Sequence, residues 1–75
     1  MKFAYIEWDD ACIQTEWHNR NDLLERYPVL SAGFVVRETN ELITIARDAD
    51  PDEKQWRGLE HIPKAMIRKK KVVKI

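Results

Sequence analysis

The single cysteine, Cys12, most constrains what this chain of 75 residues can fold into. One thiol cannot form a disulfide within a chain, and this usage is typical of proteins from a reducing compartment. A chain this short buries only about 60–65% of the surface that its unfolded form exposes, so its core is thin. We therefore expect stabilisation by association, as a homo-oligomer, or by a sheet that closes on itself.

Composition excludes several other classes of protein. A hydrophobic content of 44% excludes wholesale disorder. No apolar run approaches the ~20 residues that a membrane span needs, and the run after Lys2 is too short for a signal peptide. We expect one domain over residues 1–75, located in the cytoplasm and without a membrane partner.

Strand-like segments dominate the chain. The segments rich in β-branched, aromatic or alternating apolar residues are 2–8, 29–38, 42–46, 58–62 and 67–75. The second reads as a central strand, and Gly33 within it predicts a bulge, a bend or a close approach of two backbones. Thr39 and Asn40 predict a hairpin turn. Residues 62–66 are too short for a helix and fit a 3₁₀ turn.

The remaining segments are a short helix and a polar loop. Asn19 or Asn21 can cap a helix start, and Pro28 cannot continue one, so we expect about two helical turns between them. Residues 47–57 are polar and long for a hairpin loop. The order of elements predicts a mainly β fold with one short helix, a five-stranded SH3-like or Sm-like small barrel. Closure of such a sheet would remove its exposed edges.

Charge is segregated along a chain whose formal net charge is zero. From Lys64 onward there are cations and no acid. We take as candidate binding residues Trp56, Arg57, Lys64, Arg68, Lys69, Lys70 and Lys71. The cationic run is either an anion-binding patch or a charged edge strand that opposes aggregation. We favour the edge strand because the isoelectric point, about 6.7, is not basic.

The three tryptophans receive different interpretations. Trp8 closes the first strand and should belong to the core, and Trp17 should pack over the barrel near the helix. Trp56 stands in the polar loop beside cations. It either stacks on a base or a partner's aromatic ring, or folds back to cover one end of the barrel.

Residues that could carry chemistry are scattered. Asp9 and Asp10 could bind a metal, but adjacent strand residues point to opposite faces, so a strand end or turn is favoured. Cys12 and His18 lack a third orienting group, and His61 fits a barrel rim. The spacing of these residues is not that of a zinc motif. We predict no enzyme, no metal and no cofactor.

Several short motifs resemble those of a known group of proteins. They are Trp8-Asp9-Asp10-Ala11, then Trp17, the central run Ser31-Ala32-Gly33-Phe34-Val35-Val36-Arg37-Glu38, and Ile62-Pro63-Lys64-Ala65-Met66-Ile67. On these the chain resembles a family of short, mostly uncharacterised proteins encoded by tailed phages and prophages. Members usually have a second glycine where this chain has Ala65, and a Trp or Leu near Phe34. The resemblance implies a phage-encoded accessory protein and brings no agreed activity.

Three functions follow as hypotheses. The first is a non-enzymatic module that binds a host or phage protein through a barrel face. The second is an oligomeric Sm-like nucleic-acid-binding protein, built on the cationic last strand with Trp56 nearby. The third is a sponge for an anionic nucleotide signal in the evasion of host defence. Gly33 and Gly58 lie too far apart for a phosphate loop, but a nucleotide could lie between subunits.

Overall fold

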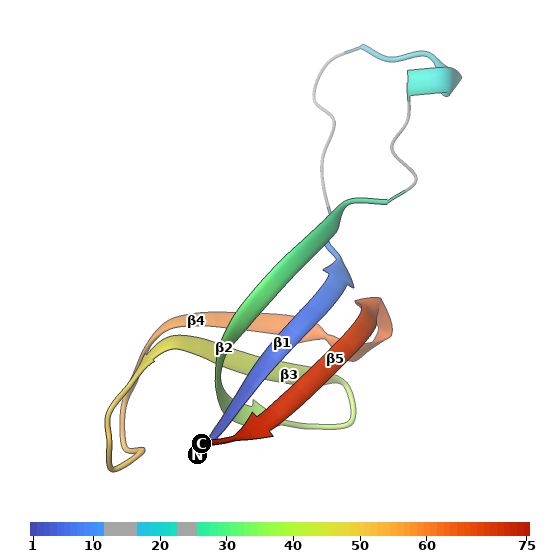
Figure 1. The fold of residues 1–75 in the computed structure, drawn as a ribbon. Coiled ribbons are helices and arrows are strands. Elements are labelled where there is room, and N and C mark those ends of the chain that lie inside the picture. Colours follow the sequence, from blue (N-terminus) through green and yellow to red (C-terminus); the bar gives the residue numbers. More distant parts are fainter. Residues whose placement is uncertain (12–16, 23–25) are drawn as a thin grey trace.

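Five strands form one antiparallel sheet in the computed structural model, which describes residues 1–11, 17–22 and 26–75. The strands are β1 (Lys2–Asp9), β2 (Pro28–Glu38), β3 (Leu42–Ala49), β4 (Trp56–Pro63) and β5 (Ile67–Lys74). Their order in the sheet is β4-β3-β2-β1-β5 (Figure 1). The mainly β, five-stranded prediction is confirmed. Among the described residues no ladder of hydrogen bonds joins β4 to β5, so the sheet is not closed.

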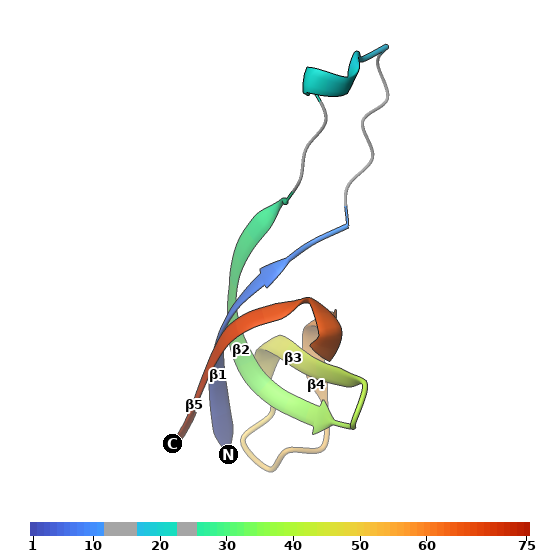
Figure 2. The ribbon, with the colours of Figure 1, turned by 90° about the vertical axis from the view of Figure 1, so that its right-hand side faces the viewer.

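The long central strand bends the sheet over itself. The first part of β2 pairs with β1, its last part pairs with β3, and the register shifts between Val35 and Arg37. Such a shift increases the local twist of a strand. As a result β3 and β4 lie across β1 and β5 (Figures 1 and 2).

Gly33 sits where two backbones meet. A Cβ atom at this position would lie 2.6 Å from the carbonyl oxygen of Ala46 on β3. Because that oxygen belongs to a paired strand, it cannot move aside easily, and only glycine fits. The expected close approach is confirmed, and the register shift comes just after it.

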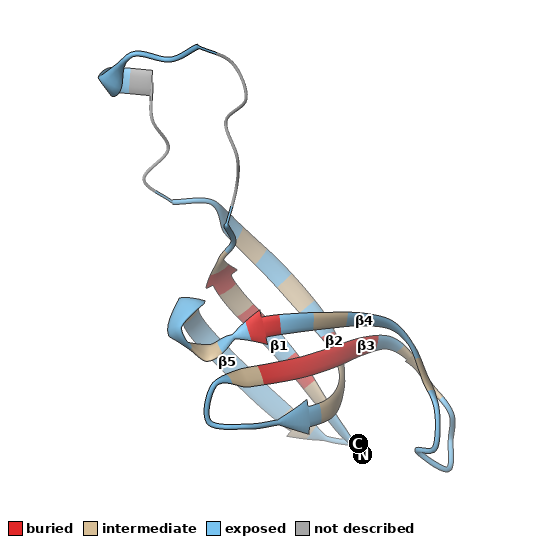
Figure 3. Ribbon diagram, turned by 180° about the vertical axis from the view of Figure 1, so that it is seen from behind, coloured by how far each residue is buried: buried red, intermediate tan, exposed pale blue. Residues whose placement is uncertain are grey.

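The core fills the space inside the bent sheet. It consists of Ala4, Ile6 and Trp8 of β1, Ile43 and Ile45 of β3, and Ile62 of β4 (Figure 3). The indole N–H of Trp8 donates a hydrogen bond to Oγ of Ser31 at 3.0 Å. The predicted core position of Trp8 is confirmed.

Three short connections join β2 to β3, β3 to β4 and β4 to β5. Thr39 closes the β2–β3 hairpin, its N–H donating to the carbonyl oxygen of Leu42 at 2.8 Å. The 3₁₀ turn η2 (Lys64–Met66) leads into β5 as expected. A loop is present where one was expected over 47–57, but it spans only 50–55, because β3 and β4 extend into the range and pair Asp48 with Arg57. The ion pair between these side chains, at 3.0 Å, stabilises the extension.

The connection between β1 and β2 carries the 3₁₀ turn η1 (Arg20–Asp22) away from the sheet (Figures 1 and 2). This turn is the described part of the predicted helix, of which residues 23–25 lie outside the described residues. Beyond these residues Arg26 and Tyr27 are not helical, and Pro28 begins β2. The expected packing of Trp17 is wrong, since its side chain is fully exposed. The polar run after Trp17 offers no apolar face to pack on.

Candidate functional site

The side of the β5-β1-β2 sheet that faces away from the core carries an exposed surface. Residues directly opposite each other in antiparallel strands share a face, and residues two apart along a strand do too. The register of β1 with β2 and β5 therefore defines this surface. We call it the outer face, and it comprises Phe3, Tyr5 and Glu7 of β1, Leu30, Ala32 and Phe34 of β2, and Lys69, Lys71 and Val73 of β5.

Aromatic rings hold one end of the outer face in a fixed arrangement. The ring of Phe3 lies edge to face with that of Phe34, with centroids 5.2 Å apart, and its centroid is 5.3 Å from that of Tyr5. Such pairs contribute about 0.5–1.5 kcal/mol beyond the burial of area. The rings therefore form a stiff surface rather than a set of independent side chains.

A shallow, mostly apolar depression of about 250 Å³ lies beside these rings. It is lined by three residues of β1 and three of β2, namely Tyr5, Ile6, Glu7, Leu30, Ser31 and Ala32. Leu30 is 83% exposed and Tyr5 52% exposed, although both lie within regular strands. Large apolar side chains exposed together, next to a polar rim, are typical of an interaction site.

Charged residues border the depression on the β5 side. Lys71 lies opposite Tyr5, and Lys69 lies opposite Glu7. Within the described ranges neither lysine has a carboxylate oxygen within 4.0 Å. These two lysines are the members of the predicted cationic set that belong to the outer face.

Other predicted cations are engaged in ion pairs instead. Nζ of Lys64 and Nζ of Lys70 lie 2.7 and 2.9 Å from the same carboxylate oxygen of Glu38. Hydrogen bonds from Lys64 and then Lys70 lower the pKa of Glu38 to about 2. We call these three residues the Glu38 cluster. It joins η2 and β5 to the end of β2, where the backbone N–H of Lys64 also donates to the carbonyl oxygen of Glu41.

Asp9 makes a second cluster at the end of β1. Its carboxylate accepts hydrogen bonds from Arg26 at 3.0 Å and from Arg68 at 3.3 Å. The next residue, Asp10, donates its backbone N–H to the carbonyl oxygen of Tyr27. Asp9 therefore ends a strand, as predicted, and ties both ends of the β1–β2 connection to β5.

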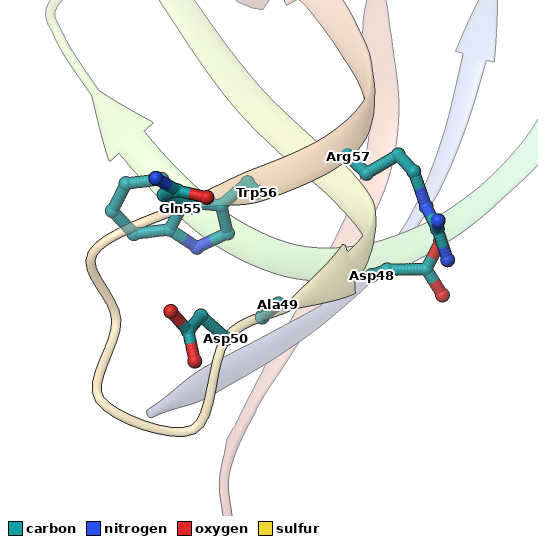
Figure 4. A pocket seen from close by; sticks show the side chains of 6 residues that line it. All are labelled: Asp48, Ala49, Asp50, Gln55, Trp56 and Arg57. Atoms are coloured by element: carbon teal, nitrogen blue, oxygen red, sulfur yellow. The ribbon is translucent and has the colours of Figure 1, made fainter.

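Trp56 and Arg57 form a separate region at the start of β4. They line a hollow of about 290 Å³ together with Asp48, Ala49, Asp50 and Gln55 (Figure 4). Asp48 accepts hydrogen bonds from Arg57 and Arg47, which lower its pKa. The Trp56 ring is half-buried, and its indole N–H is buried without a hydrogen-bond partner among the described residues.

The contacts divide the predicted site residues rather than uniting them. Trp56 and Arg57 belong to the β3–β4 hairpin. Lys64 and Lys70 bind Glu38, and Arg68 binds Asp9. Lys69 and Lys71 lie on the outer face. Sequence reasoning missed Tyr5, Leu30 and Phe34. Their alternation along two strands could be read, but it does not tell which of the two faces is buried.

The remaining candidates for chemistry are separate from one another. Nδ1 of His61 lies 2.8 Å from Oγ1 of Thr44 on the next strand, and His18 is exposed on the β1–β2 connection. Cys12, and with it the proposed Cys12–His18 pair, lies outside the described residues. In residues 1–11, 17–22 and 26–75 no three His, Cys, Asp or Glu side chains are grouped to hold a metal ion.

Two further observations bear on function. The described part of the chain has no helix of the length and apolar character needed to cross a membrane. Comparison with protein-family models, with curated proteins and with solved structures finds no match in any of the three. Function is therefore inferred from the geometry and chemistry of the molecule's own surfaces.

Proposed function

We propose that this protein is a non-enzymatic module that binds another protein through the outer face. The observation that carries this proposal is the exposure of Leu30, at 83%, near the start of the central strand, where it is paired with Glu7 of β1. An apolar side chain that is neither buried nor isolated favours a partner that covers it. Tyr5 beside it supplies an aromatic contact of the kind enriched at interfaces.

The scaffold supports this use of the face. We propose that the fold is an SH3-like small barrel, because β3 and β4 fold over β1 and β5 and a 3₁₀ turn precedes β5. In that arrangement the Glu38 cluster ties η2 and β5 to the end of β2 through side-chain contacts. A barrel of this kind would present the outer face on rigid strands, which suits binding.

The origin of the protein in a phage and its location in the host cytoplasm stay predictions. The motifs around Trp8, Phe34 and Pro63 support a tailed-phage accessory protein, and the lone cysteine supports the host cytoplasm. Self-association also stays a prediction, and the outer face is the surface through which it would be tested.

The nucleic-acid and nucleotide hypotheses receive less support from the geometry. Arg57, Lys64, Arg68 and Lys70 each lie within 4.0 Å of a carboxylate. A phosphate would have to displace these internal partners, and neutralised cations contribute little to the salt-dependent binding of a polyanion. We therefore place protein binding first.

Selection from a randomised peptide display library tests the proposal. Wild-type protein should enrich a set of peptides that Leu30→Glu binds at least tenfold more weakly, because a carboxylate in the depression removes its apolar contact. Leu59→Glu is the matched control, since Leu59 is exposed on β4 and lies outside the outer face. Circular dichroism should show all three proteins folded. Equal affinity of the wild type and Leu30→Glu for the enriched peptides would refute the proposal.

A further inference from the structure

We propose, resting on the function just proposed, that the partner segment is acidic. It is a peptide segment with an apolar anchor side chain and neighbouring Asp or Glu residues. The anchor occupies the depression at Tyr5 and Leu30, and the carboxylates bind Lys69 and Lys71.

The sheet register sets the distance between anchor and charge. Lys71 stands directly across from Tyr5 on the neighbouring strand, and Leu30 stands across from Glu7 on the other side of β1. Neighbouring strands are about 4.8 Å apart, so the depression and the two lysines lie within about two strand spacings. A segment of a few residues that crosses β1 can reach both.

Their lack of an ion pair within the described residues distinguishes Lys69 and Lys71 from the two cations of β5 that alternate with them. Arg68 and Lys70 alternate with them along the strand and form ion pairs with Asp9 and Glu38. Lys69 and Lys71 lie next to exposed apolar surface, and neither has a carboxylate within 4.0 Å in the described part of the chain. When a partner covers that surface and removes water, a charge pair beside it becomes stronger.

The charge of the outer face argues against a second copy as its occupant. The face carries two lysines and one acid, Glu7. Two such faces stacked together would bring four lysines against two glutamates. Like charges brought together in this way oppose association, whereas an acidic segment balances them.

The same face is poorly suited to nucleic acid. Polyanion binding relies on several cations along the path of the phosphates, and here two lysines stand beside a carboxylate. The mostly apolar depression favours an aliphatic or aromatic side chain over a phosphate. A protein segment satisfies both the depression and the lysines.

The display library tests this inference with a second pair of variants. Peptides enriched on the wild type should contain Asp or Glu beside an aliphatic or aromatic residue. The double variant Lys69→Glu/Lys71→Glu should bind them at least tenfold more weakly, because attraction becomes repulsion. The control Lys2→Glu/Lys74→Glu makes the same change of charge on residues paired outside the outer face, and should alter affinity less than threefold.

The outcomes separate this inference from the function on which it rests. Two results would refute the acidic partner but not the proposed binding module. One is that the enriched peptides contain no excess of Asp or Glu. The other is that Leu30→Glu weakens peptide binding while Lys69→Glu/Lys71→Glu does not. Two results would replace the partner with another class. One is a single-stranded oligonucleotide that binds at low salt through Lys69 and Lys71. The other is a dimer in light scattering that Leu30→Glu disperses.

Discussion

At the scale of single residues, two tryptophans on this sheet differ in one hydrogen bond. The indole N–H of Trp8 donates to Ser31, whereas that of Trp56 is buried without a partner among the described residues. A buried donor that has no acceptor costs about 1–3 kcal/mol in desolvation. The polar atom of Trp56 therefore opposes folding, while its ring favours it.

Replacement by phenylalanine should expose this difference. Trp8→Phe removes a satisfied hydrogen bond and core volume, and should lower the free energy of unfolding by about 1–3 kcal/mol. Trp56→Phe removes a desolvated N–H together with some packing, so it should stay within about 0.5 kcal/mol of the wild type or exceed it. Urea denaturation measures both. A loss for Trp56→Phe as large as that for Trp8→Phe would show that its N–H is satisfied in solution.

At the scale of elements, the Glu38 cluster is the contact that joins the last strand to the end of the central one. One carboxylate receives two lysines that come from η2 and β5. The side chain of Glu38 is 38% exposed, so water screens the pairs and their contribution is modest. It is also dependent on pH, because the pKa of Glu38 falls from an ordinary 4.5 to about 2 on folding.

Acid should therefore weaken this contact in a defined range. A lowered pKa means that the ion pairs stabilise the fold fully above pH about 5, and that this contribution is lost as the pH falls towards 2. Glu38→Gln should cost about 0.5–1 kcal/mol at pH 7 and flatten the dependence of the unfolding free energy between pH 5 and 2. Glu41→Gln, on an exposed neighbour, is the control. An unchanged slope in Glu38→Gln would contradict the assigned role.

Some strands and turns could be predicted from the sequence and others could not. Alternation along residues 29–38 and the turn chemistry of Thr39 are local signals, and both predicted the structure correctly. Asp48 and Arg57 pair across a hairpin, but the polar residues around them show no apolar alternation, so the segment read as a loop. Nor could alternation alone tell that small side chains, at Gly33 and Ser31, would face inward.

The candidate site was harder to predict for the same reason. The cationic run of β5 was visible in the sequence, but its division into paired and unpaired lysines depends on carboxylates distant in the chain, at Asp9 and Glu38. Leu30 and Tyr5 resemble core residues in any pattern of hydrophobicity. Their exposure follows from which side of the sheet the β3–β4 hairpin covers, which is a property of the assembled fold.

At the scale of the whole molecule, the distribution of charge follows this assembly. The formal net charge of zero reflects 13 cationic and 13 acidic residues, and the fold brings some of them together from distant segments, as in the ion pairs of Arg68 with Asp9 and of Lys70 with Glu38. Lys69 and Lys71 on the outer face have no such carboxylate partner among the described residues. Local charge of this kind influences the choice of partner more than it influences stability.

The meeting of the two chain ends has a consequence of a different kind. The backbone N–H of Ile75 donates to the carbonyl oxygen of Met1 at 2.8 Å, so the path of the backbone is nearly a ring. A short glycine linker could close that ring, and the chain could be cut elsewhere to give a circular permutant. We expect a permutant cut between Glu53 and Lys54, both exposed, to give a dispersed, native-like NMR spectrum.

A cut between Asn40 and Glu41 should be tolerated much less well. It would separate Thr39 from Leu42, whose backbone hydrogen bond closes the β2–β3 turn, and release the carbonyl oxygen of Glu41 that accepts from Lys64. Loss of dispersion in the first permutant but not in the second would contradict this ranking. If the ranking holds, the order in which the strands are joined matters less to this fold than the sheet they form together.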